Sequence, residues 1–308
     1  MINPVNQPLE TSSCQPLEMD KEALINLSLV EKLRYIDGII IQSSKAQSVF
    51  KKIEECHNST KYLSKPQCMT IIGKSGIGKT TFSETYLKRY PEKELPEYTQ
   101  KPVFYSIIPC PAYIGSLPNS MLQSLGDPFY AKGRNIFTQT KRLYNFLKVS
   151  KVEIIFIDEV QHLVDRNSQK LLRDSSDWFK ELIDEVRIPI IFMGMPDSKR
   201  IFVENEQLGT RVRYKEELLP FEYDISFRKF LRLYDNELPF KNLSNLGSTE
   251  LSKKIHIATS GIMRNIKDLV LEASNISLQL NLNQISVSAL AEAFDRVLYD
   301  TGENVFNC

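Results

Sequence analysis

One short segment constrains this chain more than any other, because residues 73–80 fit the pattern G-x-x-x-x-G-K-[ST] at every fixed position. Glycines in such a segment let consecutive backbone N–H groups point into one concavity, and the N-terminus of a following helix adds partial positive charge to that anion site. The run 68–72 before it is typical of a strand, and residues 81–89 are typical of a helix. We therefore predict a nucleoside triphosphate site in which Lys79 reaches the β- and γ-phosphates and Thr80 ligates Mg²⁺.

Composition limits the remaining possibilities. The chain has 308 residues, 42% of them hydrophobic, which is enough for a substantial core. Because 39 basic residues nearly balance 38 acidic ones, any contact with DNA must come from a local patch. The five cysteines are widely spaced without a C-x-x-C pair, which argues against a disulfide framework or a zinc site. The apolar runs are too short for a membrane span, so we expect a soluble, cytoplasmic protein.

The chain divides into three parts. Residues 1–20 combine prolines with polar side chains and are expected to form a flexible N-terminal arm. In residues 21–219 apolar strands alternate with helices, which predicts an α/β ATPase domain with a parallel sheet covered on both faces. Residues 220–308 contain only helical patterns and are expected to form an all-helical lid domain with a short C-terminal tail. Strands are expected at 69–72, 103–108, 153–157, 188–193 and 212–218, and helices at 23–35, 45–56, 81–89, 169–186, 226–233, 250–258, 262–280 and 287–298.

An acidic pair, Asp158 and Glu159, follows the apolar run 154–157. Asp158 is predicted to hold Mg²⁺ directly or through water, and Glu159 to orient the water that attacks the γ-phosphate or accept its proton. Solvated acids after an ordinary strand are the alternative. The pair favours an ATPase over a small-molecule kinase. The residues predicted to bind ATP are Gly73, Lys74, Ser75, Gly76, Ile77, Gly78, Lys79, Thr80, Thr81 and Asp158.

Three arginines are candidates for contact with the γ-phosphate. Arg264 lies in the first turn of the helix expected at 262–280, off its apolar face, where it could close over the phosphate and report its presence. Arg211 and Arg213 precede and open the last strand, and alternation predicts that both point to one side. A guanidinium there could act on the site of a neighbouring subunit. An ordinary surface arginine, or a salt bridge at a sheet edge, is the alternative for each.

The surface that would contact DNA is less clearly marked. Lys132 and Arg134 belong to a local excess of basic residues that continues through Lys141 and Lys148, and Lys101 is the next candidate. Subunits of a ring would repeat such a patch along the DNA backbone, giving salt-dependent binding. A solvated charged face explains the same residues equally well.

Taken together, these motifs resemble an AAA+ ATPase over residues 40–298. Within that class, the segments 157–163, 189–196 and 205–212 are similar to the TniB/TnsC family of transposon target-selection ATPases, where they read Asp-Glu-x-Gln-His-Leu, an apolar run ending in Gly-x-Pro, and Asn-x-Gln-Leu before the arginines. One departure concerns a polar sensor residue, which AAA+ proteins commonly carry at the end of the fourth strand. Here that strand ends in Met193-Gly194-Met195, so we expect slow turnover that suits a switch.

The resemblance implies a regulator of DNA transposition. Family members assemble with ATP into rings or helical filaments on double-stranded DNA, recruit a transposase, and receive target information from a TniQ/TnsD-type protein, which in some elements is linked to a CRISPR effector. ATP binding would promote assembly and hydrolysis would reset it.

Two other functions fit the same motifs. A helicase loader or replication initiator is the first alternative. A signalling NTPase is the second, which the sequence disfavours because no effector domain is attached. His162 resembles a metal or base residue in isolation, but without ligand spacing it is better explained by packing or a partner contact.

Overall fold

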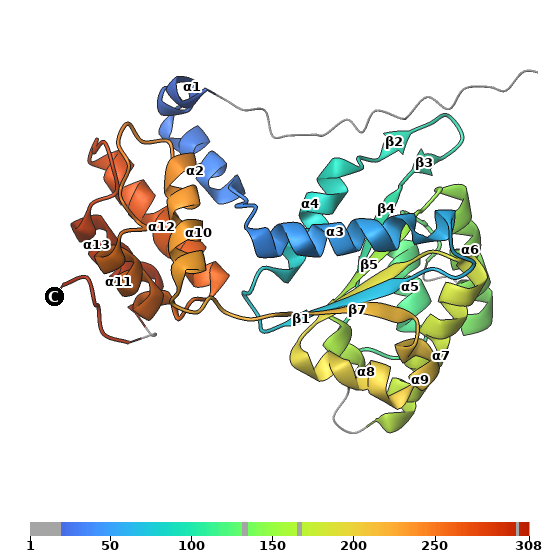
Figure 1. The fold of residues 1–308 in the computed structure, drawn as a ribbon. Coiled ribbons are helices and arrows are strands. Elements are labelled where there is room, and N and C mark those ends of the chain that lie inside the picture. Colours follow the sequence, from blue (N-terminus) through green and yellow to red (C-terminus); the bar gives the residue numbers. More distant parts are fainter. Residues whose placement is uncertain (1–19, 131–134, 165–167, 300–301, 308) are drawn as a thin grey trace, which may run out of the picture.

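The computed structural model describes residues 20–130, 135–164, 168–299 and 302–307, and in these ranges it contains a parallel sheet flanked by helices and a separate group of helices (Figure 1). The arm expected at 1–20 lies outside the described residues, apart from Asp20. The strands are β1 (Cys68–Gly73), β2 (Lys93–Glu94), β3 (Thr99–Gln100), β4 (Val103–Ile107), β5 (Ile154–Asp158), β6 (Ile190–Gly194) and β7 (Val212–Leu218). The helices are α1 (Lys21–Ile25), α2 (Leu29–Gly38), α3 (Ser44–Asn58), α4 (Lys79–Arg89), α5 (Ser116–Ser124), α6 (Ile136–Val149), α7 (Gln169–Val186), α8 (Lys199–Glu204), α9 (Glu206–Gly209), α10 (Ile225–Glu237), α11 (Thr249–Thr259), α12 (Met263–Gln279) and α13 (Val287–Val297).

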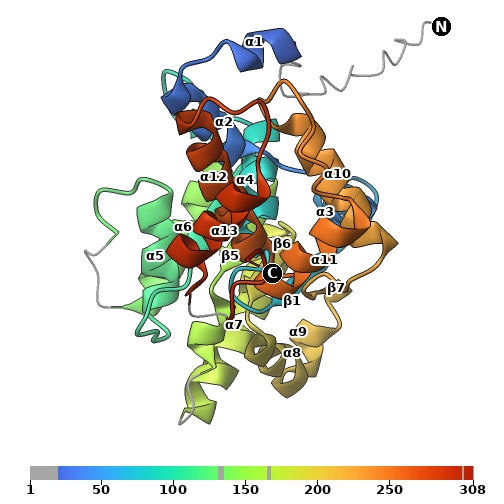
Figure 2. The ribbon, with the colours of Figure 1, turned by 90° about the vertical axis from the view of Figure 1, so that its left-hand side faces the viewer.

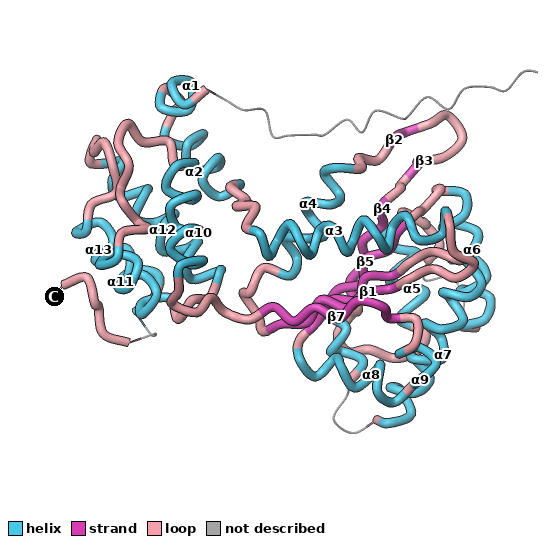
Figure 3. Tube along the Cα trace, viewed as in Figure 1, coloured by secondary structure: helices cyan, strands magenta, loops and turns pink. Residues whose placement is uncertain are grey.

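The sheet has the order β4-β5-β6-β1-β7, and every neighbouring pair is parallel. All five strands had been predicted, to within two residues at either end. β1, β5 and β6 are buried along their whole length, as expected for strands covered on both faces. The strands lie side by side in one sheet, drawn in magenta in Figure 3. Because they are parallel, the loop after β1 and the acids at the end of β5 lie at the same edge, with only β6 between them.

Helices cover both faces of the sheet. On one face α3 and α4 bury Val49, Phe50, Ile53 and Tyr86 against apolar side chains of the strands. On the other face α5, α6 and α7 form the larger core, with Leu122, Leu143, Phe179 and Ile183 fully enclosed. The short strands β2 and β3 form a separate antiparallel pair that precedes β4.

The helical domain has its own core, built from α10 to α13. Phe227, Ile255, Ile266 and Phe294 are buried together there, one from each helix. Part of the tail also packs in this domain, because Phe306 is 4% exposed and joins the same cluster. The four helices predicted after residue 220 are therefore confirmed.

The N-terminal helices differ from the prediction in two ways. One helix was expected at 23–35, but the chain forms α1 and α2, since Ser28 caps α2 and exchanges hydrogen bonds with Glu31 in a capping box. In addition, these residues had been placed with the sheet domain, whereas Ile36 is completely buried in the core of the helical domain and α2 packs along α12 (Figure 2). The chain therefore passes from the helical domain to the sheet after α2 and returns after β7.

The return crossing is fixed by backbone contacts. Phe221 donates its N–H to the Gly261 carbonyl at 2.9 Å, and the Phe221 carbonyl accepts from His256 Nε2 at 2.7 Å. A Cβ at position 261 would lie 2.1 Å from that carbonyl oxygen, and the φ of Gly261 is +66°. Only glycine satisfies both conditions, so the crossing segment is held close to the start of α12.

Ile36→Ala tests the position of α2. Removing this buried side chain should destabilise the helical domain by about 2–5 kcal/mol, the usual cost of such a truncation in a core. Val30→Ala is the matched control, since Val30 lies on the same helix and is 57% exposed. Urea unfolding of both variants checks this, and equal midpoints would contradict the assignment of α2 to the core.

Candidate nucleotide site

The loop after β1 has the backbone that an anion site requires. Gly76 and Gly78 have φ angles of +76° and +95°, in the left-handed region that glycine enters without a Cβ penalty. Gly78 is the N-cap of α4, so the positive end of that helix faces the loop. Gly73 closes β1, where a Cβ would lie 2.8 Å from the Leu218 carbonyl oxygen of β7. The glycines of the motif are therefore required by close approach and backbone conformation.

Lys79 is folded across this loop. Its ammonium donates to the carbonyl oxygens of Gly73 at 2.8 Å and of Lys74 at 3.1 Å, and the residue is 9% exposed. Burial lowers the pKa of Lys79, while the nearby carboxylates of Asp158 and Glu159 oppose that shift. The side chain is therefore a buried cation at the mouth of the loop, where phosphate oxygens could replace the two carbonyls as its acceptors.

Asp158 joins the loop to β5. Its Oδ2 accepts from Thr80 Oγ1 at 3.0 Å and from Tyr105 OH at 3.1 Å, and its Oδ1 accepts from the Glu159 N–H at 2.8 Å. Asp158 is 2% exposed, and burial together with the charge of Asp158 raises the pKa of Tyr105. The carboxylate is thus held by three donors at the end of the strand.

Thr80 and Asp158 have the donor chemistry that Mg²⁺ requires, because hydroxyl and carboxylate oxygens are its preferred protein ligands. Within the described parts of the chain, no cluster of three or more His, Cys, Asp or Glu side chains could hold a metal ion. Mg²⁺ bound here would complete its shell with phosphate oxygens and water, as this cation usually does.

Glu159 has an uncommon backbone for its type, with φ 59° and ψ 34°. Its carboxylate accepts a hydrogen bond from the Gln161 side-chain amide, and the side chain is 43% exposed toward solvent. His162 lies nearby, but its Nδ1 donates to the Ile108 carbonyl at 2.8 Å and its Nε2 is 3.9 Å from Glu159 Oε2. His162 is therefore hydrogen-bonded to the backbone just after β4, and the packing or partner contact expected from the sequence stays a prediction.

Gln161, like Tyr105, is a residue of this site that the sequence analysis did not single out. Its side chain lies between Glu159 and the end of β6, where its Oε1 accepts from the Met195 N–H at 2.9 Å. Its position two residues after Glu159, inside a segment that resembled the family pattern, was the available signal. No spacing rule could show that this amide reaches a different strand.

Arg264 is placed beside the loop, on the helical domain. The backbone N–H of Arg264 donates to the Gly76 carbonyl at 2.9 Å. The residue is exposed, and its guanidinium Nη1 donates to Ser75 Oγ at 3.4 Å. The predicted apolar face of the helix is confirmed, since Ile266 and Leu269 are fully buried. The helical domain thus contacts the phosphate loop directly.

Arg211 and Arg213 lie at the opposite, amino-terminal edge of the sheet. The expectation that both point to one side is wrong, because a β-bulge shifts the register so that Cys68 pairs with Val212 and Met69 with Tyr214. Arg213 is the extra residue. Consistent with the bulge, Val212 packs into the core under α7 and Tyr214 packs on the side of α3.

The two arginines consequently have different partners. Arg211 forms a bidentate ion pair with Asp184 of α7, at 2.6–2.9 Å, and its side chain is 14% exposed. Arg213 is exposed and contacts the neighbouring Tyr214, whose hydroxyl donates to Glu55 of α3. Arg211 is therefore occupied within its own subunit, and Arg213 is available to another molecule.

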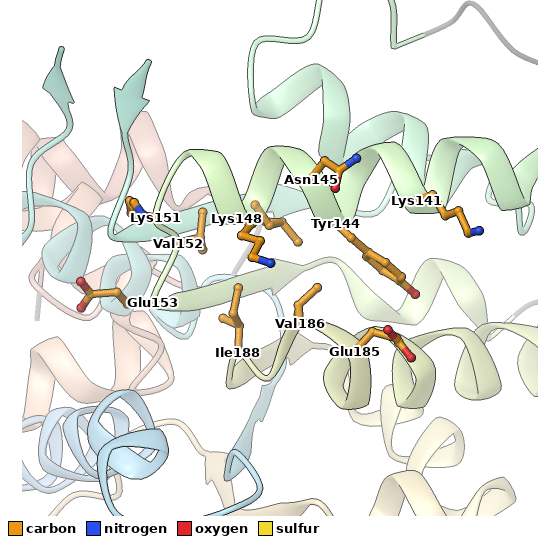
Figure 4. A pocket seen from close by; sticks show the side chains of 11 residues that line it. Lys141, Tyr144, Asn145, Lys148, Lys151, Val152, Glu153, Glu185, Val186 and Ile188 are labelled. Atoms are coloured by element: carbon orange, nitrogen blue, oxygen red, sulfur yellow. The ribbon is translucent and has the colours of Figure 1, made fainter. Parts of the chain in front are cut away.

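The DNA candidates are only partly described. Lys132 and Arg134 lie outside the described residues. Lys101 donates to Glu92 at 2.9 Å and its side chain is 16% exposed, so its charge is already paired. Lys141 and Lys148 line a groove of about 640 Å³ between α6 and the end of α7 (Figure 4). Because its other walls are formed by segments that precede β5 and β6, the groove is at the edge opposite the phosphate loop.

The strand order, the loop after the central strand, the acids after β5 and the helical domain over the loop define an AAA+ P-loop NTPase fold. The chain matches the model of the bacterial TniB protein family over residues 33–221, more than half of its length. It therefore belongs to the TniB family.

Solved structures support the fold assignment. Cdc6p from Pyrobaculum aerophilum has a TM-score of 0.60 at 14% identity, with 86% of this chain and 71% of that chain covered. The Aeropyrum pernix ORC2 protein, in its ADPNP-ADP complexes, has a TM-score of 0.59 at 15% identity, covering 85% and 71%. The Aeropyrum pernix ORC1 protein in complex with DNA scores 0.58 at 14% identity, covering 86% and 69%.

No match was found among curated proteins. Among the described helices, none is both long and apolar enough to cross a membrane.

Proposed function

We propose that this protein is an ATP-dependent, DNA-binding regulator of DNA transposition that assembles on duplex DNA and hydrolyses ATP to reset. The observation that carries the proposal is the hydrogen bond between Thr80 and Asp158, which brings the phosphate loop and the acidic pair into one site. Membership in the TniB family supplies the biological process. The protein would work in the cytoplasm, where target DNA is available in a bacterium.

The side chains would divide the chemistry as follows. Lys79 and the loop N–H groups bind the phosphates, and Thr80 with Asp158 holds Mg²⁺, which would neutralise charge on the β- and γ-phosphate oxygens. Glu159 orients the attacking water and accepts its proton. Arg264, next to the loop, neutralises charge on the γ-phosphate and reports its presence to the helical domain. Because β6 ends without a polar side chain, turnover is slow and the protein acts as a switch.

Assembly would complete the site. Arg213 is the first choice for an arginine that acts on a neighbouring subunit, since it is exposed at the edge opposite its own loop. Arg211 would have to leave Asp184 before it could do so. Dependence on an arginine from the next subunit makes hydrolysis conditional on a ring or filament.

The proposed partners are duplex DNA, a transposase and a target-selection protein of the TniQ/TnsD type, which could be associated with a CRISPR effector. Lys132 and Arg134 remain the first choice for DNA contacts, and Lys101 falls behind them because it is paired with Glu92. DNA affinity should fall steeply with salt, since such contacts act on the phosphate backbone.

A replication initiator or helicase loader remains the second candidate. The observation that favours it is the similarity in fold to the Cdc6p and ORC proteins, one of which was solved with DNA. At 14% identity this similarity concerns the fold, so a partner has to separate the two functions.

Lys79→Ala and Glu159→Gln form the first test. Lys79→Ala should weaken ATP binding about 30-fold or more, because a charged hydrogen bond is worth about 2 kcal/mol, and ATP-dependent DNA binding should be lost with it. Glu159→Gln should keep ATP affinity but slow hydrolysis about 100-fold, so assemblies on DNA should last longer. Nucleotide titration and electron microscopy with DNA check both, and unchanged DNA binding by the lysine variant would remove the mechanism.

Mixing experiments test the role of the arginines. Arg213→Ala alone should abolish ATPase activity on DNA, and adding the Lys79→Ala variant should restore part of it, because that variant supplies an intact Arg213 to the neighbouring site. Arg211→Ala is the matched comparison, since it breaks the ion pair with Asp184 and should mainly affect stability. Steady-state ATPase rates across mixing ratios measure this, and recovery for Arg211→Ala but not for Arg213→Ala would reverse the assignment.

Affinity capture distinguishes the two functions. With ATP and duplex DNA present, the protein should retain a transposase of the DDE type, whereas the Lys79→Ala variant alone should not, because without ATP-bound subunits beside it this variant does not assemble. Retention of a replicative helicase in place of the transposase would support the initiator and exclude the transposition role.

A further inference from the structure

We propose that Gln161 is a positioning residue for ATP hydrolysis, which fixes the Glu159 carboxylate and couples it to the end of β6. This role rests on the proposed ATPase function. The Gln161 amide would take the place of the polar sensor residue that β6 lacks. The role is inferred from two hydrogen bonds made by one side chain between two neighbouring strands.

The orientation of the Gln161 amide follows from its partners. The Met195 N–H can only donate, so it must face Oε1, which lies 2.9 Å away. The Glu159 carboxylate can only accept when ionised, so it faces Nε2. Reversing the amide would lose both hydrogen bonds, and Gln161 therefore has a single arrangement that satisfies both neighbours.

Space at the end of β6 explains why the polar group comes from another segment. A Cβ at position 194 would lie 2.9 Å from Gln161 Oε1 and 2.3 Å from Ser198 Oγ. Real Cβ atoms do not approach so closely, so a side chain on Gly194 would displace the Gln161 amide and the Ser198 hydroxyl from their present positions. The 3₁₀ turn Val160–Leu163, which is separated from β5 by Glu159 alone, supplies Gln161 in its place.

Glu159 needs such a partner. Its side chain is 43% exposed, and a long exposed carboxylate otherwise samples many rotamers. His162 Nε2, at 3.9 Å, is beyond hydrogen-bond distance, so Gln161 is the side chain that donates to Glu159 in the described part of the site. Without that hydrogen bond, Glu159 would spend less time where it can orient a water molecule.

The contact also links two strands. Met195 directly follows β6, and β6 lies between β1, which leads into the phosphate loop, and β5, which ends at Asp158. A shift of the end of β6 therefore changes the hydrogen bond to Gln161, and through it the position of Glu159. This arrangement lets hydrolysis respond to the packing between the two strands.

Three variants test the proposal. Gln161→Ala removes both hydrogen bonds, and Gln161→Glu keeps the acceptor for the Met195 N–H but replaces the donor to Glu159 with a repelling carboxylate. Both should lower kcat about 10- to 100-fold, the usual effect of a misplaced reacting group, while the Kd for an ATP analogue changes less than twofold. Gln123→Glu, the same change at an exposed position of α5, is the matched control and should keep the wild-type rate.

A double-mutant cycle separates positioning from a structural role. If Gln161 acts through Glu159, then Gln161→Ala should cause no further loss in the Glu159→Gln background in single-turnover hydrolysis. An equal additional loss in that background, or a parallel weakening of analogue binding, would overturn the proposal. If the wild-type protein hydrolyses ATP and the Gln161 variants do so at the same rate, the role of Gln161 is overturned and the proposed ATPase function stands. If the wild-type protein assembles on DNA without hydrolysing ATP, the ATPase function and the role of Gln161 are both overturned.

Discussion

The hydrogen bond from Thr80 to Asp158 is the contact on which the rest of the site depends, since it connects the loop after β1 to the end of β5 across β6. β6, which lies between those two strands, ends in Gly194, where a Cβ would displace the Gln161 amide and the Ser198 hydroxyl from their present positions. The Gln161 amide, which comes from the turn after β5, lies beside Gly194 and accepts from the Met195 N–H. In the proposed mechanism, the Gln161 amide therefore stands where β6 itself offers no polar side chain.

The second constraint is that the chain crosses between its two domains twice. The first crossing follows α2, and the second lies between β7 and α10, where Phe221 is held by Gly261. Since α2 packs along α12, and α12 begins against the phosphate loop through Arg264 and Gly76, a displacement at the loop reaches the N-terminal helices by one continuous set of contacts. A movement of the lid would therefore have to bend both crossings together.

Much of the fold could be predicted from the sequence because it rests on local patterns. Buried parallel strands appear as continuous apolar runs, and in a helix with one apolar face the apolar residues recur about every 3.6 positions. For this reason β1, β5 and α12 could be recognised. The errors concern long-range choices. The burial of Ile36 depends on a partner helix more than two hundred residues away in sequence, and the bulge at Arg213 depends on how β1 pairs with β7. Neither leaves a periodic signal in its own segment.

The same distinction explains the candidate site. Gly76, Lys79, Asp158 and Glu159 belong to segments in which spacing determines the chemistry, and the structure brings them together. The roles of Arg211 and Arg213 cannot be predicted from spacing, because they depend on partners. Arg211 forms an ion pair with Asp184, whereas within the described residues Arg213 forms no ion pair. An exposed guanidinium is well solvated, and enclosing it at a subunit contact is favourable only if the contact provides an anion. In the proposed assembly, a triphosphate bound by a neighbouring subunit would be such an anion, so the unequal pairing of these arginines leads us to expect that Arg213 becomes buried only when nucleotide is present across that interface.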